Sequence, residues 1–242
     1  MRVIVTGASR GIGRAIAIRM AQRYADKLTI GLMARSDNRP IHQSVSGSLA
    51  RTCSMVEKYG AHPIRLPTDL RNVPATRSMI SYFIDFAGGL DVLINNASAM
   101  SIDPKSHFQK NRMDLVHEVN TRGTMTCIDE CRDALMHSTG SIVTISPPIR
   151  MGRLEWLRMY GVPYTISKYS MTLATLAEAR HTLRANCIWP RYTIATSATR
   201  RLETSGVLPN AHSHGRDPMD FASCVLQLAI DDRERNAQCV FD

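Results

Sequence analysis

Residues 1–13 constrain the possible fold of this 242-residue chain more than any other segment. A short apolar run at 3–5 is followed by Gly7, Gly11 and Gly13, and a helical pattern of apolar residues begins at Ile12. Glycine lets backbone amides come close to a pyrophosphate, and the positive end of the following helix points at the same anion. This order predicts a strand, a phosphate-binding turn and a helix. A tight turn without a ligand is the alternative.

Strand and helix patterns alternate along the rest of the chain. We expect strands at 28–33, 62–66, 91–94, 141–146 and 185–189, and helices at 12–24, 49–59, 72–88, 114–137, 162–180 and 218–230. This alternation is typical of an α/β fold, in which a doubly wound parallel sheet is covered by helices on both faces. Because no linker interrupts the series, we predict one domain over residues 1–242. Ligands of such sheets bind beyond the carboxyl ends of the strands, where the polar segments fall.

The composition is that of a globular protein, with 44% hydrophobic and 21% charged residues. No apolar run is long enough to cross a bilayer and no secretory signal precedes the first strand, so we expect a cytoplasmic protein without a membrane span. The six cysteines lack metal-ligand spacing, which predicts reduced thiols and no metal site. The net charge of +9 fits phosphorylated small ligands, and the dispersed Lys and Arg residues do not favour a nucleic-acid partner.

One pair of side chains indicates proton chemistry. Tyr164 and Lys168 are four residues apart in a predicted helix, so both side chains lie on one face. The pKa of a tyrosine is normally about 10, and a neighbouring ammonium lowers it by favouring the phenolate. The pair therefore predicts that Tyr164 acts as a general acid or base tuned by Lys168. The bare pattern also occurs by chance on helical surfaces, and its position after the fifth predicted strand gives it weight.

Three further polar residues follow predicted strands or interrupt a helix. Asn120 lies within the long helix at 114–137, where an asparagine lowers helix stability. It is either locally hydrogen-bonded or an amide that holds a water beside the lysine and completes a proton relay. Asn95 follows the fourth strand and can brace the sheet, while the adjacent backbone at Ala97 can face a ribose. Asp69 can accept the amino hydrogens of adenine, or it forms a turn.

These segments resemble the short-chain dehydrogenase/reductase family across nearly the whole chain. The resemblance is carried by the Thr-Gly-x-x-x-Gly-x-Gly turn at 6–13, by the Tyr-x-x-x-Lys pair, and by the stretches at 95–100, 119–123, 145–148, 164–169 and 189–191. The stretches narrow the resemblance to one subgroup of the family. It implies a Rossmann fold, dependence on NAD(P), a carbonyl or alcohol substrate of lipid-like character, and a homodimer or homotetramer.

The chain departs from the family pattern in two places. The catalytic serine of the family precedes the tyrosine by about a dozen residues, whereas Ser146 precedes Tyr164 by 18, and Pro147 stands where the strand would put the serine. We take Ser146 as the candidate that orients the substrate carbonyl, because strand alternation gives it the same face as Thr144. Arg191 replaces the glycine that often follows the proline. Ile194 and Thr196 can still contact the nicotinamide carboxamide.

Charge favours one cofactor over the other. An acidic residue at the end of strand two recognises a 2′-hydroxyl, and an arginine recognises a 2′-phosphate. Here Arg35 follows strand two, with Arg10 nearby in the turn, so we predict NADP(H) in preference to NAD(H); an arginine without a ligand is the alternative. The predicted cofactor-binding residues are Gly7, Ser9, Arg10, Gly11, Ile12, Gly13, Arg35, Asp69, Asn95, Ala97, Tyr164, Lys168, Ile194 and Thr196.

The sequence therefore predicts an oxidoreductase whose catalytic residues are Tyr164, Lys168, Asn120 and Ser146. A non-catalytic dinucleotide sensor or scaffold on the same fold is the alternative. Segments at about 150–163 and 197–217 should roof the site, and their apolar residues suit an apolar substrate. Apolar lids also serve simply to exclude water, so the substrate itself is left open.

Overall fold

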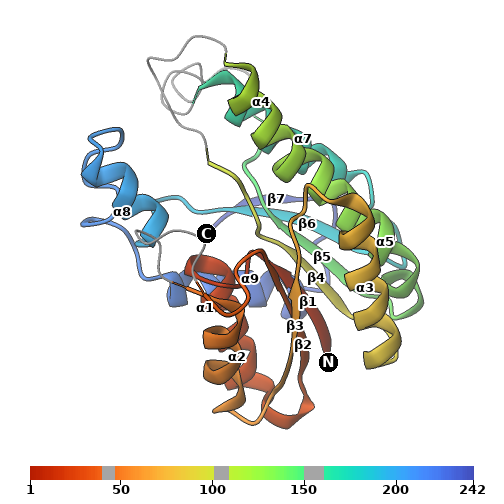
Figure 1. The fold of residues 1–242 in the computed structure, drawn as a ribbon. Coiled ribbons are helices and arrows are strands. Elements are labelled where there is room, and N and C mark those ends of the chain that lie inside the picture. The colour runs from red at the N-terminus through yellow and green to blue at the C-terminus, as the bar shows by residue number, and fades with distance from the viewer. Residues whose placement is uncertain (40–46, 101–108, 150–160) are drawn as a thin grey trace.

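Seven parallel strands form one sheet in the order β3-β2-β1-β4-β5-β6-β7 (Figure 1). The computed structural model describes residues 1–39, 47–100, 109–149 and 161–242. The strands are β1 Arg2–Thr6, β2 Thr29–Ala34, β3 His62–Pro67, β4 Val92–Asn95, β5 Ser141–Ile145, β6 Arg184–Trp189 and β7 Cys239–Phe241. The all-parallel sheet confirms the predicted doubly wound α/β fold.

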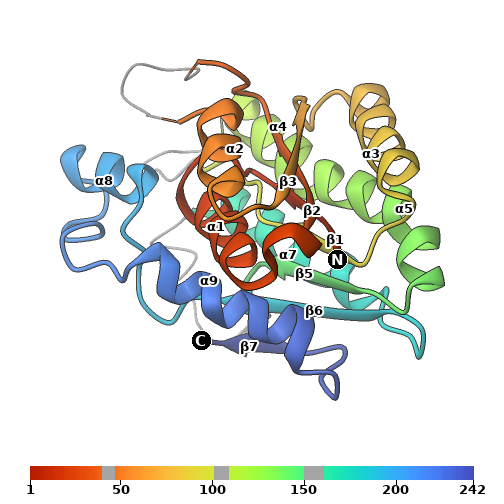
Figure 2. The ribbon, with the colours of Figure 1, turned by 90° about the horizontal axis from the view of Figure 1, so that it is seen from below.

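Helices cover both faces of the sheet (Figures 1 and 2). One face carries α1 Gly11–Tyr24, α2 Leu49–Glu57 and α9 Pro218–Leu226, and the other carries α3 Val73–Ala87, α5 Gly123–His137 and α7 Val162–Leu176. Two shorter helices, α4 Lys110–Val116 and α8 Ser197–Thr204, lie beyond the carboxyl edge of the strands. In the described part of the chain, no helix combines the length and the apolar character needed to span a membrane.

The central strands are apolar on both sides because helices bury both faces. Val3, Ile4 and Val5 of β1 are all fully buried, and they divide between the two cores: Val3 and Val5 pack towards α1 and α9, and Ile4 packs towards α3 and α5. Such an unbroken apolar run is what a parallel sheet covered on both faces requires. The edge strand β3 has a proline near its start, Pro63, and another at its end, Pro67. Proline has no N–H to donate, so it is tolerated in an edge strand.

The strand order reverses at β1, and this reversal positions the site. β1 pairs with β2 on one side (Thr6 with Met33) and with β4 on the other (Val5 with Ile94). The chains leaving β1 and β4 therefore diverge to opposite faces and leave a crevice between them, where doubly wound sheets bind their ligands.

Several elements differ from the sequence prediction. The helix expected at 218–230 consists of α9 followed by a π-helical turn, Gln227–Asp231. The helix expected at 114–137 begins at Lys110 and contains a π-helical turn, His117–Arg122, before it continues as α5. The strand β7 was not predicted, because three residues are too few for a periodic pattern. The helix α8 was assigned to a lid loop, since it has no buried residue and hence no apolar stripe; its signal is the capping box that Thr196 forms with Thr199.

Candidate active site

The glycine turn leads directly from β1 into α1. Gly7 and Gly11 have φ angles of +70° and +55°, left-handed values that favour glycine. At Gly13 the reason is packing: a Cβ there would lie 2.5 Å from both the carbonyl oxygen of Gly7 and the Nδ2 atom of Asn96. The three glycines are therefore needed for the turn to take this shape.

Asn96 closes the turn from the side of β4. Its Nδ2 donates hydrogen bonds to the carbonyl oxygens of Thr6 at 2.8 Å and of Gly7 at 3.3 Å. The Thr6 hydroxyl in turn accepts hydrogen bonds from the backbone N–H groups of Asn96 at 3.1 Å and Ala97 at 3.0 Å. These contacts fix the start of the turn to the chain that follows β4.

Asn95 and Asn96 are adjacent but serve different neighbours. Asn95 is buried, and its Nδ2 donates to Thr144 Oγ1 on β5 at 3.4 Å, so it braces the sheet. Its Oδ1 is buried without a hydrogen-bond partner among the described residues. The sequence reasoning chose Asn95 and missed Asn96. The sequence did contain a signal for Asn96: consecutive residues of an extended chain point to opposite faces, so two adjacent asparagines must have different neighbours.

The first turn of α1 has no side chain that caps it. Its N-cap residue, Arg10, makes no side-chain cap hydrogen bond, and no acidic residue lies in the first turn. In contrast, Ser48 caps α2 by accepting from Arg51 N at 3.2 Å, and Asn72 caps α3 by accepting from Ala75 N at 3.1 Å. The amide groups at the start of α1 thus remain suited to an anion.

Arg10 and Arg35 bring two positive charges to this turn. Burial lowers the pKa of Arg10, and the charge of Arg35 lowers it further. The exposed side chain of Arg35 lies 4.0 Å from a carboxylate oxygen of Asp69. Within the turn, Ser9 is buried and Ile12 packs against the core. The mutual repulsion of the two guanidinium groups favours an added negative charge between them.

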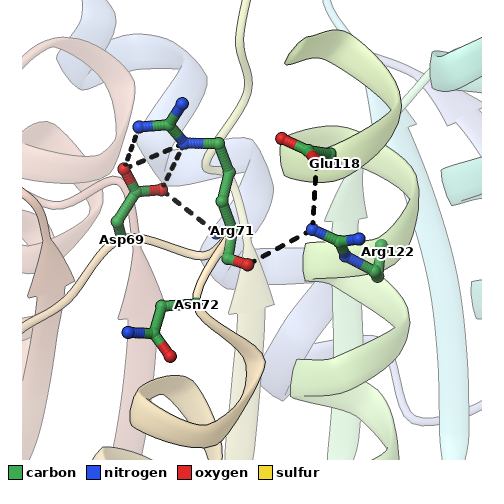
Figure 3. Close-up of a pocket in the computed structure, with 5 residues that line it drawn as sticks. All are labelled: Asp69, Arg71, Asn72, Glu118 and Arg122. Atoms are coloured by element: carbon green, nitrogen blue, oxygen red, sulfur yellow. Dashed lines mark hydrogen bonds and ion pairs between the residues drawn. The ribbon is translucent and has the colours of Figure 1, made fainter. Parts of the chain in front are cut away.

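A pocket of about 280 Å³ lies next to Asp69 and is lined by Asp69, Arg71, Asn72, Glu118 and Arg122 (Figure 3). Arg71 folds back and donates to both carboxylate oxygens of Asp69 at 2.7–3.1 Å. Burial raises the pKa of Asp69, but the hydrogen bonds from Arg71 outweigh it and hold the pKa below its usual value. Arg122 donates to the Arg71 carbonyl at 3.2 Å. An adenine amino group would share the Asp69 carboxylate with Arg71.

Tyr164 and Lys168 lie one turn apart in the first half of α7 and are only 7% and 3% exposed. Lys168 Nζ donates to the carbonyl oxygen of Ile145, the last residue of β5, at 2.5 Å. It also lies 5.4 Å from the centre of the Trp189 ring. Burial lowers the pKa of Lys168 to about 7, and the nearby Cys187 acts in the opposite direction.

Asn120 is fully buried in the π-helical turn. Its side chain is held by Ala99, whose N–H donates to Oδ1 at 2.7 Å and whose carbonyl accepts from Nδ2 at 3.0 Å. The same Nδ2 donates to Ser167 Oγ at 2.9 Å, and Ser167 Oγ donates to the Tyr164 carbonyl at 2.7 Å. Asn120 is therefore connected to the Tyr164 turn of α7 through Ser167, which the sequence reasoning did not single out.

Ser146 lies beneath α7 and is fully buried. The Thr172 hydroxyl is within hydrogen-bond distance of the Ser146 hydroxyl, at 2.9 Å, and of the Pro147 carbonyl, at 2.7 Å. One turn further along, Thr144 and Thr175 share a hydrogen bond of 2.6 Å. Thr144 and Ser146 thus face the same helix, in agreement with strand alternation, and the structure directs Ser146 towards Thr172.

The segment after β6 approaches the glycine turn from the other side. A Cβ on Gly11 would lie 3.4 Å from Thr196 Cγ2, so Thr196 stands directly opposite the turn. The Thr196 hydroxyl accepts a hydrogen bond from Thr199 N at 3.2 Å. The carbonyl of the buried Ile194 accepts one from the Thr199 hydroxyl at 2.7 Å. Of the two predicted lids, the part at 150–160 lies outside the described residues, and 197–217 contains α8.

Residues 1–205 match the family model described as short chain dehydrogenase. The match includes the glycine turn, Asn95 and Asn96 at the end of β4, and the Tyr164–Lys168 pair. This chain belongs to the short-chain dehydrogenase family.

Curated relatives of this short-chain dehydrogenase support the narrower resemblance inferred from the sequence. The mouse hydroxysteroid dehydrogenase-like protein 2 is 34% identical over 209 residues, which cover 85% of this chain and 41% of the mouse protein. Across the relatives of that name, the chain spans between 38% and 49% of their length. These relatives agree with the resemblance that the sequence predicted.

Solved structures support the fold of this short-chain dehydrogenase. A short chain dehydrogenase from Mycobacterium thermoresistibile has a TM-score of 0.85 at 27% identity, covering 99% of this chain and 84% of that one. A Mycobacterium paratuberculosis enzyme bound to NAD (22% identity, TM-score 0.78, 99% and 95% covered) shares the fold. So does a Thermococcus sibiricus alcohol dehydrogenase complexed with 5-hydroxy-NADP (19%, 0.78, 100% and 95%). Proteins of this fold therefore bind either dinucleotide.

Proposed function

We propose that this short-chain dehydrogenase is an NADP(H)-dependent oxidoreductase that interconverts a carbonyl and an alcohol on an apolar, lipid-like substrate. One observation carries the proposal: Tyr164 lies one helical turn before Lys168, and the buried ammonium of Lys168 is bonded to the end of β5. This is the edge of the sheet at which the glycine turn also lies. Proton chemistry and phosphate binding can therefore act on one ligand.

The residues around the glycine turn fit a dinucleotide. The uncapped first turn of α1 supplies amide donors, Arg10 and Arg35 supply positive charge, and the buried Oδ1 of Asn95 has no partner among the described residues. When bound, the nicotinamide would donate or accept the hydride. Arg10, Gly11 and the neighbouring amides would hold the phosphates, and Ile194 and Thr196 would lie near the nicotinamide.

Tyr164 moves the proton in this proposal. It donates its phenolic proton to the carbonyl oxygen during reduction and accepts a proton from the alcohol during oxidation. A protonated Lys168 one turn away favours the phenolate and so makes the proton easier to release. Because burial brings the pKa of Lys168 to about 7, its charge changes near neutral pH, and the reaction should respond to pH in that range.

Asn120 supports this reaction by holding the tyrosine in position. The hydrogen bonds from Asn120 to Ser167 at 2.9 Å and from Ser167 to the Tyr164 carbonyl at 2.7 Å connect the π-helical turn to the first half of α7. A π-helical turn is often found at functional sites. We propose that Asn120 fixes this geometry. The water relay beside Lys168 that the sequence suggested stays a prediction, because the amide of Asn120 is already bonded to Ala99 and Ser167.

Arg35 is the proposed determinant of cofactor choice. It follows β2, where the adenosine ribose is recognised in this fold, and its exposed guanidinium lies 4.0 Å from a carboxylate oxygen of Asp69. A 2′-phosphate would accept hydrogen bonds from it and would relieve the repulsion between Arg35 and the half-buried Arg10.

A non-catalytic dinucleotide sensor or scaffold is the second candidate. The observation in its favour is Ser146, whose buried hydroxyl is hydrogen-bonded to Thr172 beneath α7 instead of facing a substrate. Tyr164, Lys168 and Asn120 argue for catalysis, because a sensor does not need a buried lysine next to a tyrosine.

The two candidates are separated by turnover. Purified protein would be assayed for NADPH and NADH oxidation with a panel of ketones and acyl-CoA thioesters, beside the variant Tyr164→Phe. We expect substrate-dependent oxidation that Tyr164→Phe abolishes while the variant still binds NADPH, since the phenyl ring keeps its packing. If NADPH binds but no carbonyl is reduced, the sensor is favoured. Unchanged turnover in Tyr164→Phe contradicts the mechanism.

We also propose that the protein is a homo-oligomer that associates through α5 and α7. Ile166 and Leu173 lie two turns apart on one face of α7 and are 45% and 59% exposed, and Met125 on the adjacent α5 is 47% exposed. Large apolar side chains exposed on two helices packed against each other are typical of an interface.

A further inference from the structure

Asp242 carries a carboxylate that is fully buried, although it lies beyond the end of the edge strand β7. Its Oδ1 accepts a hydrogen bond from the backbone N–H of Arg191 at 2.8 Å, and its Oδ2 forms an ion pair with the guanidinium of Arg216. A buried carboxylate is costly unless it is paired and hydrogen-bonded, and here both oxygens have a partner. The mechanism described above does not use this group.

Arg216 extends the contact from Asp242 to the segment that follows β6. The backbone N–H of Arg216 donates to the Thr193 carbonyl at 2.8 Å, and its carbonyl accepts from Ala195 N at 2.8 Å. The neighbouring Gly215 allows this approach, because a Cβ there would lie 2.7 Å from Ala195 N. Asp242 therefore holds the segment 191–195 at its beginning directly and at its end through Arg216.

The segment held in this way ends opposite the phosphate-binding turn. Thr196 follows Ala195, caps α8, and has its Cγ2 atom 3.4 Å from the position of a Cβ on Gly11. A shift of the segment 191–195 would move Thr196 relative to that turn. The position of one wall of the cofactor site therefore depends on a carboxylate at the far edge of the sheet.

We propose that Asp242 is a positioning residue for the cofactor site: through Arg191 and Arg216 it fixes the segment 191–196 against the phosphate-binding turn. This inference rests on the proposed dinucleotide binding. It assigns a task to Asp242, Arg216 and Gly215, which neither the glycine turn nor the Tyr-x-x-x-Lys pair indicates.

The test compares variants of the full chain, carrying any purification tag at the N-terminus. Asp242→Ala removes both contacts, Asp242→Asn keeps an acceptor for Arg191 N, and Arg216→Met breaks the ion pair from the other side. Asp231→Asn is the matched control, because Asp231 forms an ion pair with Arg23 at 2.5 Å on the surface of α1. NADPH and NADH binding would be followed by cofactor fluorescence, and thermal unfolding by circular dichroism.

We expect Asp242→Ala and Arg216→Met to weaken binding of the preferred dinucleotide about tenfold, Asp242→Asn to weaken it less, and Asp231→Asn to leave it unchanged. This graded order, with melting temperatures close to that of the control, distinguishes positioning from a general loss of stability. Parental affinity in both Asp242→Ala and Arg216→Met overturns the proposal.

A second measurement separates failure of this inference from failure of the proposed function. Hydrogen exchange of the cofactor-free protein would be followed by mass spectrometry for peptides covering 191–196. If the parent binds neither dinucleotide, the proposed function is wrong. The positioning of the segment 191–196 by Asp242 is still tested, because Asp242→Ala should raise hydrogen exchange in these peptides and leave the β1 peptides unchanged. Equal exchange in the parent and in Asp242→Ala overturns this positioning role.

Discussion

Lys168 Nζ donates a hydrogen bond of 2.5 Å to the carbonyl oxygen of Ile145, so the ammonium of α7 is bonded to the last residue of β5. The lysine is 3% exposed, and its remaining neighbours include the face of Trp189 and the thiol of Cys187. The ammonium is thus in contact with the Ile145 carbonyl and the Trp189 ring, where the ammonium of a surface lysine would be hydrated. Burial therefore dominates its titration, and the consequences can be measured without knowing the substrate.

The first prediction concerns stability against pH in the cofactor-free protein. Burial lowers the pKa of Lys168 from 10.5 to about 7, so between these values the unfolded chain binds more protons than the folded one. Stability contributed by this residue should therefore rise with pH from about 7 towards 10, by on the order of a few kcal/mol. Below pH 7 the folded protein carries the full cost of the buried charge.

The variant Lys168→Met is the comparison that isolates this effect. Urea unfolding of both proteins at pH 6.5, 8 and 9.5 gives the difference in unfolding free energy at each pH, and titrations common to both proteins cancel. We expect the advantage of Lys168→Met over the parent to be largest at pH 6.5 and to shrink as the pH rises. A difference that does not change with pH contradicts the buried, titrating lysine.

The second prediction concerns cofactor choice. Arg35→Ala should raise the Kd for NADPH about 10- to 100-fold, because a hydrogen-bonded ion pair to the 2′-phosphate is lost, and should leave the Kd for NADH nearly unchanged. Fluorescence titration with both cofactors measures this. Arg23→Ala is the control, since Arg23 pairs with Asp231 at 2.5 Å, away from the glycine turn. A parent that prefers NADH, with no change in Arg35→Ala, would refute the assignment.

The parts of the molecule that were predictable are those in which local pattern and global fold agree. Val3–Val5 and the glycines at 7, 11 and 13 predicted β1, the turn and α1. In the structure the apolar run forms β1, Gly7 and Gly11 take left-handed backbone angles, and α1 begins at once. The helix layers on both faces of the sheet were predicted from the alternation of strand and helix patterns along the chain. This agreement of levels explains why the fold could be predicted from one sequence.

The remaining parts depend on tertiary contacts that no local pattern carries. Asn96 braces the turn by bonding Thr6 and Gly7, residues about ninety positions away, and only the sheet brings them together. Ser146 follows a strand and keeps the predicted face, but that face is covered by Thr172 of α7. The three-residue β7 is formed by pairing with β6, and its neighbour Asp242 accepts a hydrogen bond from Arg191 just after β6. Each depends on residues distant in sequence.

The third prediction tests Asn96. Asn96→Ala removes the donor to the Thr6 and Gly7 carbonyls, which should lower the free energy of unfolding by about 1–3 kcal/mol and weaken the binding of NADPH and NADH alike. Asn236→Ala is a matched asparagine control: it removes the acceptor for Ala185 N at 2.9 Å and the donor to the Arg180 carbonyl at 3.0 Å, at the amino end of β6, and should lower stability by about 1–3 kcal/mol without affecting either cofactor. Urea unfolding and fluorescence titration measure the two effects. Equal cofactor affinities in both variants would contradict the role of Asn96.

The fourth prediction tests the α5–α7 face. Leu173 is 59% exposed on α7, so Leu173→Glu replaces an apolar contact by a charge that an interface would have to bury unpaired. We expect the parent to have the mass of a dimer or tetramer by light scattering after size exclusion, and Leu173→Glu to shift towards the monomer. Phe86→Glu on α3 is the control, because Phe86 is 65% exposed on a helix outside the proposed interface. A monomeric parent, or dissociation caused equally by Phe86→Glu, would exclude this face as the site of association.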